Sequence, residues 1–191
     1  GDVYKRQKYH NVPGAKEYTH SIQTLSKARE TFHSISELPK GARVGIVGAG
    51  LSGIELASEL RESRTDLEII LFDRGPRILR NFPEKLSNYI AKWFRENNVN
   101  VVPNSLIDKV EQGTIYNNGT PEPVDIVVWT AGIQPVEIVR KLPIDTNKSG
   151  RVIVNQYHQV PTYKNVYVVG DCAALPHAPS AQLAEVQGDH M

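Results

Sequence analysis

The sequence predicts an α/β protein with three layers, in which a parallel sheet carries helices and a small antiparallel meander, followed by part of a second domain. Short apolar runs of strand length alternate with helical patterns between residues 43 and 102, as in parallel sheets with right-handed crossovers. A glycine-rich turn follows the first of these runs. A chain of 191 residues is long enough for one complete domain and an attached piece.

The alternating region is predicted to contain three strands and two helices. The strands are expected over 43–47, 67–72 and 99–102, where the residues are almost all apolar. A helix over 51–61 places Ile54, Leu56, Ala57 and Leu60 at helical spacing. A second helix over 83–97 begins at a proline and is expected to turn Leu86, Ile90, Trp93 and Phe94 inward.

The segments before residue 43 are predicted to be a polar linker and one helix. Residues 1–20 are polar and the first seven show no periodicity. The helix follows from apolar residues at steps of three and four, with Ser21 as its N-cap; these residues are Ile22, Leu25, Ala28, Phe32 and Ile35.

The segments after residue 102 are predicted to be mostly short strands. Asn118-Gly119 indicates a hairpin turn and 124–129 a buried strand. Beyond Pro135 we expect a short helix, strands over 151–154 and 166–169, and a polar C-terminal helix.

The bulk composition excludes several classes of protein. A net charge of +1 argues against a nucleic-acid partner. The apolar runs are too short for a membrane helix. A single cysteine, Cys172, excludes an internal disulfide and is expected to be a small buried residue, which fits the reducing cytoplasm. Metal-ligand spacing is absent from the histidines, which are His10, His20, His33, His158, His177 and His190.

The strongest local motif is Gly48-Ala49-Gly50-Leu51-Ser52-Gly53, which fits the pattern G-x-G-x-x-G. Gly48 allows a tight turn, Gly50 lets a pyrophosphate approach the backbone, and Gly53 lets the helix lie close to the strand. The free N–H groups at the start of that helix are suited to phosphates. The pattern stands between a strand and a helix, so it predicts a Rossmann-like dinucleotide site.

An acidic residue at the end of the second strand strengthens this prediction. Asp73 can accept hydrogen bonds from the ribose hydroxyls of the adenosine, which favours NAD(H). Arg74 and Arg77 lie where an arginine can hold the 2′-phosphate of NADP(H). The carboxylate of Asp73 would repel that phosphate, and we therefore favour NADH over NADPH.

Three further features are ambiguous when taken singly. Glu55 is equally a surface residue favoured by the helix dipole or a carboxylate directed at the nicotinamide. The turn at Ala131-Gly132 places backbone at the edge of the sheet. Gly170-Asp171 ends an apolar run, and Asp171 by itself is a turn aspartate, although a carboxylate at such an edge can bind the ribityl chain of a flavin.

Together these motifs resemble the pyridine-nucleotide–disulfide-reductase-like flavoproteins, and among them the type II NADH dehydrogenases. The resemblance covers residues 13–191 and includes the family form G-x-G-x-x-G-x-E-x-A over 48–57. It implies that the glycine turn and Asp73 hold NADH, that Glu55 and Ala131-Gly132 border the nicotinamide, and that Asp171 holds FAD. It also implies hydride transfer from NADH to FAD and then electron transfer to a quinone, so the expected residue roles are binding rather than proton transfer.

Two departures from that family pattern stand out. The family's first G-x-G-x-x-G unit, which grips the ADP half of FAD, and its C-terminal membrane region have no counterpart here. We therefore expect a piece that binds NAD(H) but neither binds FAD nor turns over. Residues 1–40 would be the end of a first FAD segment, 41–136 the NAD(H) domain, and 137–191 a partial FAD segment. The quinone motif A-Q-x-x-x-Q is matched by Ala181 and Gln182, but Val186 replaces its second glutamine and Gln187 comes one residue late.

The resemblance implies that the longer enzyme from which such a piece comes lies at the periphery of a membrane, on its cytoplasmic face.

Two other classes of protein are weighed against the resemblance to NADH dehydrogenases. Short-chain dehydrogenases need a Tyr-x-x-x-Lys after the glycine turn, whereas the spacing occurs only at Tyr4 and Lys8, before it. A non-catalytic NAD(H)-binding regulatory module remains the alternative, although the Asp171 motif favours a flavoenzyme. The sequence leaves the oligomeric state open.

Overall fold

The computed structural model describes residues 5–7, 9–135, 139, 141–176 and 181–189. The chain divides into two compact units, of which one comprises residues 7–132 and the other combines residues 133 onward with those before Gln7. Each unit is described by itself below.

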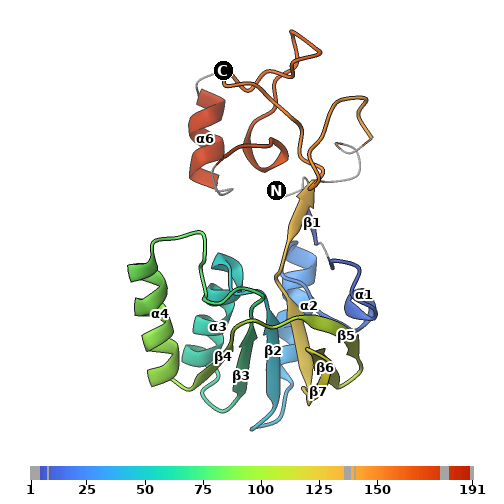
Figure 1. Cartoon of the computed structure of the whole chain (residues 1–191). Coiled ribbons are helices and arrows are strands. Elements are labelled where there is room, and N and C mark those ends of the chain that lie inside the picture. The colour runs from blue at the N-terminus through green and yellow to red at the C-terminus, as the bar shows by residue number, and fades with distance from the viewer. Residues whose placement is uncertain (1–4, 8, 136–138, 140, 177–180, 190–191) are drawn as a thin grey trace. The chain divides into compact units, whose positions relative to one another are not determined.

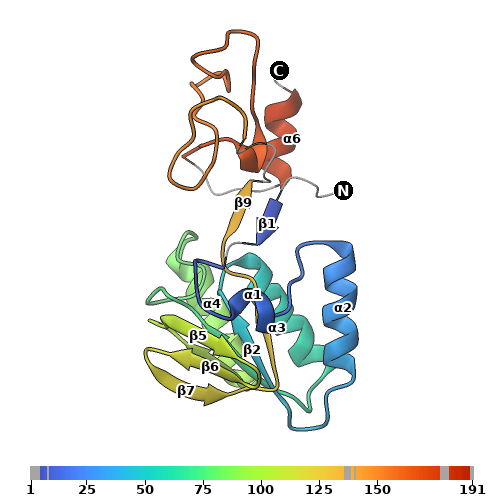
Figure 2. The ribbon, with the colours of Figure 1, turned by 90° about the vertical axis from the view of Figure 1, so that its right-hand side faces the viewer.

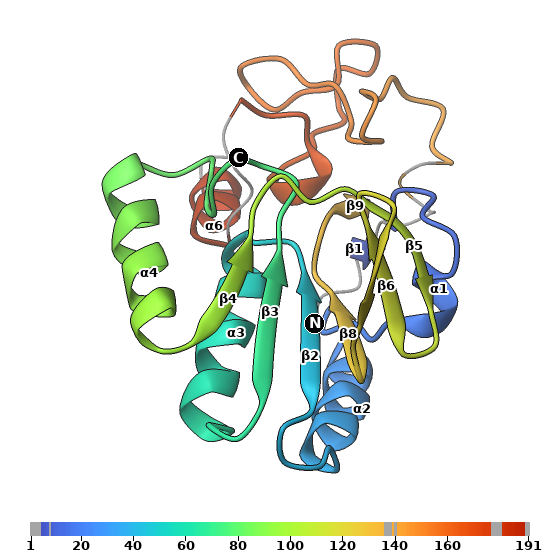
Figure 3. The same cartoon turned by 60° about the horizontal axis from the view of Figure 1, so that its bottom comes forward.

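The unit of residues 7–132 is built on a four-stranded parallel sheet. Its strands are β2 (Arg43–Val47), β3 (Glu68–Phe72), β4 (Val99–Val102) and β8 (Ile126–Trp129), in the order β4-β3-β2-β8. Figure 3 shows the four strands side by side with their carboxyl ends at one edge. Because the strands are buried on both faces, they are almost wholly apolar, and this is why the sequence predicts them.

Helices cover one face of this sheet (Figure 2). They are α2 (Leu25–Ser36), α3 (Leu51–Ser63) and α4 (Glu84–Glu96). Ile46, Leu71 and Val128, which lie at one level on neighbouring strands, pack in one buried cluster with Ile54 of α3 and Phe94 of α4.

The other face of the sheet is covered by an antiparallel meander and a short helix, α1 (Ala15–Tyr18). The meander consists of β5 (Ile107–Glu111), β6 (Thr114–Asn117) and β7 (Thr120–Pro123). The predicted hairpin is confirmed: Asn118 and Gly119 both have positive φ, 50° and 76°, as a type I′ turn requires. The α/β three-layer fold predicted from the sequence is therefore confirmed.

The N-cap predicted for the first long helix is wrong. α2 begins at Leu25, and the side chain of Thr24 caps it by accepting the N–H of Lys27. Ser21 lies before the helix, where its backbone oxygen accepts the hydroxyl of the buried Thr31. The predicted apolar face is also only partly buried, because Ile35 is 4% exposed whereas Leu25 is 69% and Phe32 75% exposed.

Two other details of the prediction need correction. Leu86 on α4 is 40% exposed, and the neighbouring Ser87 is buried instead, because its hydroxyl donates to the oxygen of Ile78. The N-terminal residues without periodicity include a strand, β1 (Lys5–Gln7), which pairs with β9 (Ile133–Pro135). Strand pairing through backbone groups leaves no signal in the side-chain pattern.

The second unit contains β9, the 3₁₀ turn η1 (Gly170–Cys172) and α6 (Ala181–Asp189). The polar C-terminal helix is thus confirmed, and Figure 1 labels it. The strands predicted over 151–154 and 166–169 are wrong: single bridges form at Val152 and Tyr167 instead. Most of the short helix predicted after Pro135 lies outside the described residues.

The described helices include none that is long and apolar enough to cross a membrane. Residues 7–40 pack into the same compact unit as the sheet, with Ile35 in the core cluster of the helical layer. The functional division into three segments at residues 40 and 136 stays a prediction.

Candidate functional site

A cavity of about 520 Å³ opens at the carboxyl edge of the parallel sheet. The last residues of three strands, Val47, Phe72 and Trp129, line it. Ligands bind outside this edge in open α/β sheets, and the volume lies in the ordinary range for small-molecule sites. The lining also includes seven of the residues predicted for the site, namely Gly48, Ala49, Gly50, Asp73, Arg74, Ala131 and Gly132.

The glycine-rich turn joins β2 to α3 as the motif predicts. Gly48 leaves the strand with φ of +107°, and a Cβ there would lie 2.9 Å from the backbone of Ala131. A Cβ on Gly53 would lie 1.8 Å from the carbonyl oxygen of Gly48. Glycine is therefore required at both positions, at the first for the turn and at the second for the close approach of α3 to the turn.

The amino end of α3 faces open space. Its N-cap is Gly50, which has no side chain to cap the helix, and a Cβ built there meets no atom within 4 Å. The first hydrogen bond within the helix runs from the N–H of Ile54 to the oxygen of Gly50. The N–H groups of Leu51, Ser52 and Gly53 come before it and have no acceptor within the helix. This end can receive an anionic group that approaches the backbone closely.

Asp73 lies half-buried at the end of β3, and its carboxylate joins two turns. One oxygen accepts the N–H of Ala49 and the other accepts the N–H of Gly75, each at 2.7 Å. A carboxylate has about four lone-pair positions, so acceptor capacity remains for hydroxyl groups of a ligand. The same side chain can thus fix the glycine-rich turn and bind a diol.

Arginines lie beside this carboxylate, but one of them differs from the sequence prediction. Arg74 is exposed and lines the cavity, as does Arg80, which the sequence reasoning missed. The guanidinium of Arg77 instead donates to the backbone oxygens of Leu79, Arg80 and Phe82, at 3.0–3.3 Å. Arg77 therefore stabilises the loop, whereas Arg80 lines the cavity, where the sequence had placed Arg77.

Thr130, directly after β8, is a second residue whose role was missed. Its hydroxyl lies 3.0 Å from the oxygen of Val47 and 2.9 Å from that of Gly48. Its N–H also donates to the oxygen of Val47. The sequence signal that could have indicated this role is a hydroxyl residue placed directly after a buried strand, at this edge of the sheet. Thr130 holds the start of the glycine-rich turn against the neighbouring strand.

Four of the predicted residues lie outside the cavity lining. Leu51 and Ser52 are exposed on the first turn of α3, and Gly53 is buried in its contact with Gly48. Glu55 is exposed on the same helix, so its predicted role at the nicotinamide stays a prediction.

The remaining two predicted residues, Gly170 and Asp171, belong to the second unit. They form η1 with Cys172, which is half-buried rather than buried as the sequence predicted. Gly170 has φ of +67° and its N–H donates to the side-chain oxygen of Gln187 at 2.8 Å. Asp171 is half-buried.

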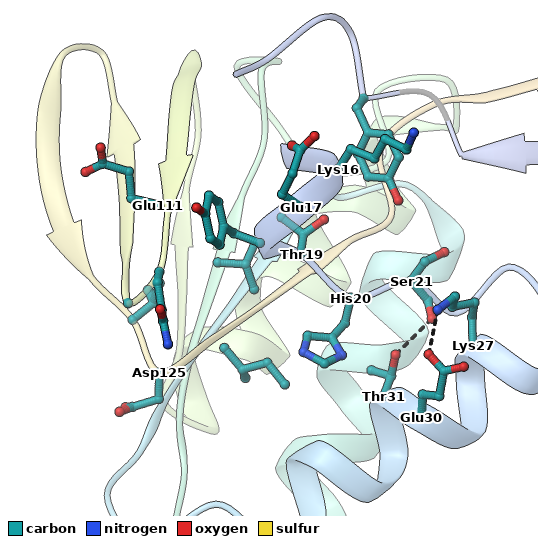
Figure 4. Close-up of a pocket in the computed structure, with 17 residues that line it drawn as sticks. Lys16, Glu17, Thr19, His20, Ser21, Lys27, Glu30, Thr31, Glu111 and Asp125 are labelled. Atoms are coloured by element: carbon teal, nitrogen blue, oxygen red, sulfur yellow. Dashed lines mark hydrogen bonds and ion pairs between the residues drawn. The ribbon is translucent and has the colours of Figure 1, made fainter. Parts of the chain in front are cut away.

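A larger cavity of about 620 Å³ lies beside β8 and is shown in Figure 4. Four carboxylates, of Glu17, Glu30, Glu111 and Asp125, line it against two lysine side chains. Such an excess of negative charge repels a pyrophosphate, so this cavity does not suit a dinucleotide.

His20 lies inside this second cavity, near Lys27 and Glu30 of α2 (Figure 4). Burial lowers the pKa of His20, the positive charge of Lys27 lowers it further, and Glu30 partly offsets both effects. Lys27 and Glu30 form an exposed ion pair at 2.6 Å. Metal binding has no support within the described residues, where His, Cys, Asp and Glu side chains form no group of three or more that could hold an ion.

A parallel sheet with a glycine-rich turn, an open helix terminus and an acid at the next strand defines a Rossmann-type dinucleotide-binding unit. The family of the chain follows from a match that extends well beyond the residues of this site. The chain belongs to the pyridine nucleotide-disulphide oxidoreductase family, whose model matches residues 5–188.

Curated relatives agree with the resemblance predicted from the sequence. The NADH dehydrogenase-like protein YutJ of Bacillus subtilis is 56% identical over 96% of this chain and 52% of its own length. The type II NADH:quinone oxidoreductase of Haemophilus influenzae is 28% identical over 69% of this chain and 33% of its own length. The chain thus spans about half the length of the first of these relatives and a third of the second.

Solved structures agree on the fold. The water-forming NADH oxidase of Lactobacillus brevis, bound to NADH, superposes with a TM-score of 0.83 at 18% identity, covering 97% of this chain and 43% of its own. NDH2 of Plasmodium falciparum, in complex with NADH, superposes with a TM-score of 0.72 at 19% identity, covering 90% of this chain and 42% of its own.

Proposed function

We propose that this chain is the NADH-binding part of a flavin-dependent NADH dehydrogenase. The observation that carries the proposal is the cavity at the carboxyl edge of the sheet, where Gly48, Gly50 and Asp73 lie around one space. Relatives named as NADH dehydrogenases support it. The cofactors would be NAD(H) and, in the longer enzyme, FAD.

The residues present fit a dinucleotide. The backbone at Gly50 and the amino end of α3 would hold the pyrophosphate, because a Cβ at Gly50 would occupy the open space there. Asp73 would accept the ribose hydroxyls of the adenosine while Ala49 and Gly75 hold its carboxylate in place. Ala131 and Gly132 would border the nicotinamide, and Glu55 would approach it from α3. We favour NADH because the charge of Asp73 opposes a 2′-phosphate.

Asp171 would bind the ribityl chain of the flavin, in the turn that Gly170 begins. The bound cofactors supply the redox chemistry, a hydride from the nicotinamide to FAD and then electrons to a quinone or another acceptor, whereas the protein orients them. We place the longer enzyme in the cytoplasm or on the cytoplasmic face of a membrane.

A calorimetric titration of the purified chain with NADH, NADPH and FAD in parallel tests the proposal. We expect NADH to bind, NADPH to bind more weakly, and the chain alone to show no turnover. Asp73→Asn should weaken NADH binding, and Asp108→Asn, which should bind as wild type does, is its matched control, because Asp108 also accepts a backbone N–H, that of Gly119, but in the meander. If NADH does not bind to the folded chain, the glycine-rich turn is not a working site and the proposal fails.

A further inference from the structure

The contact between α6 and η1 in the second unit assigns a role to a glutamine that the motif comparison leaves unused. Gln187 is 7% exposed although its side chain is polar. Its Oε1 atom accepts the N–H of Gly170 at 2.8 Å. A buried amide oxygen that accepts a backbone N–H satisfies both groups and ties the two segments together.

Gly170 allows α6 to come close enough for this bond. Its φ of +67° is a left-handed conformation that favours glycine. A Cβ at Gly170 would lie 3.1 Å from the Cβ of Ala184, on the same helix face as Gln187. The preceding residue, Val186, points elsewhere and is 54% exposed.

The opposite end of η1 is held by a second set of backbone bonds. The N–H of Val152, which is fully buried, donates to the oxygen of Cys172 at 2.8 Å. The N–H of Ala174 in turn donates to the oxygen of Val152 at 2.8 Å. Both neighbours of Asp171 are therefore held in place: the N–H of Gly170 by Gln187, and the oxygen of Cys172 by Val152.

We infer that Gln187 is a positioning residue that fixes the turn presenting Asp171, and that it does not contact an electron acceptor. The inference rests on the proposed function, because Asp171 matters in this way only if it binds a flavin. Gln187, which comes one residue after the second glutamine position of the A-Q-x-x-x-Q pattern, would then support the proposed flavin-binding turn through its bond to Gly170. The motif position itself presents the apolar side chain of Val186 to solvent, so this chain offers no amide there to a quinone carbonyl.

The test uses amide hydrogen exchange of the whole chain, followed by NMR. In a Gln187→Leu variant the N–H of Gly170 loses its acceptor, and its protection should fall roughly tenfold. Gln187→Glu keeps an oxygen at the site and should retain the protection. Val186→Gln restores the motif on the exposed side and should leave Gly170 unchanged. Equal protection of Gly170 in wild type and Gln187→Leu would overturn the inference.

A second readout separates positioning from a merely structural bond. Flavin mononucleotide carries the ribityl chain but lacks the adenosine half of FAD, which the absent glycine-rich unit would hold, so its titration should shift the NMR signals of Asp171 in wild type. The apparent affinity should fall roughly tenfold in Gln187→Leu and recover in Gln187→Glu. An unchanged affinity in Gln187→Leu would overturn the positioning role. If flavin mononucleotide leaves Asp171 unshifted in wild type, the flavin assignment itself fails, whereas NADH binding to the other unit is unaffected.

Discussion

The carboxylate of Asp73 accepts a hydrogen bond from the backbone N–H of Ala49, across 2.7 Å, in the middle of the glycine-rich turn. The residue proposed to recognise the adenosine ribose therefore also holds the turn proposed to receive the pyrophosphate. In the proposed site, recognition of the two halves of the ligand would therefore be coupled through one side chain.

This coupling makes Asp73→Asn more harmful than the loss of one ribose contact. The amide keeps one oxygen acceptor but turns an NH₂ group toward the N–H of Ala49 or of Gly75. We expect the affinity for NADH to fall between about tenfold and about a hundredfold, measured by calorimetry. The affinity for NADPH should fall less, because the charge opposing its 2′-phosphate is removed. A parallel fall for both nucleotides would contradict a direct role of Asp73 at the ribose.

Gly50 and Gly53 form a matched pair that separates binding from folding. In Gly53→Ala the new methyl group would overlap the oxygen of Gly48, and we expect a loss of about 2–3 kcal/mol of stability in urea unfolding. In Gly50→Ala the methyl group enters open space, so stability should fall by less than about 1 kcal/mol.

The same Gly50→Ala variant should bind NADH at least about tenfold more weakly, because the methyl group occupies the space proposed for the pyrophosphate. Normal NADH affinity in a stably folded Gly50→Ala protein would show that the phosphates do not approach the turn at Gly50.

The strands and helices of the Rossmann-type unit could be predicted because burial on both faces of the sheet leaves an apolar signal in sequence. The turn could be predicted because it needs glycines at Gly48 and Gly53 for steric reasons. Periodicity shows only that apolar residues share a helix face, and it therefore misplaced Leu25 and Phe32, which remain largely exposed.

The arginines of the site could not be ranked from sequence, since their roles depend on the path of the backbone after β3. That path brings three carbonyl oxygens around Arg77 and leaves Arg80 beside the cavity. The pairing of β1 with β9 was missed for a related reason, because it depends on backbone groups from distant parts of the chain.

Arg77 and Arg80 should consequently behave in opposite ways when each is replaced by alanine. Arg77→Ala removes a guanidinium bonded to three backbone oxygens and should cost about 1–3 kcal/mol of stability. Arg80→Ala should change stability by less than about 0.5 kcal/mol.

Arg80→Ala should instead weaken NADPH more than NADH, because a cation beside Asp73 interacts with the 2′-phosphate. Urea unfolding and parallel nucleotide titrations separate the two effects. A destabilised Arg80→Ala protein with unchanged nucleotide affinities would reverse the assignment.

His20 should make the stability of the chain depend on pH below neutrality. Its pKa in the folded chain is lowered from the ordinary value of 6.5, by burial first and then by Lys27. The unfolded chain therefore binds more protons between the lowered pKa and 6.5. The contribution of His20 is fully present above 6.5 and is lost as the pH falls through that window.

His20→Gln should remove this contribution, so that stability falls less between about pH 7.5 and about pH 5 than it does in wild type. The measurement is the urea midpoint at both pH values. His33→Gln is the control, since the side chain of His33 is 73% exposed, and it should follow wild type. The three proteins share all their carboxylates, so the carboxylate titration is a common background apart from the charge effect of His20 on Glu30 and the exposed contact of His33 with Glu37. An identical pH dependence in His20→Gln and wild type would show that His20 titrates as it does in the unfolded chain.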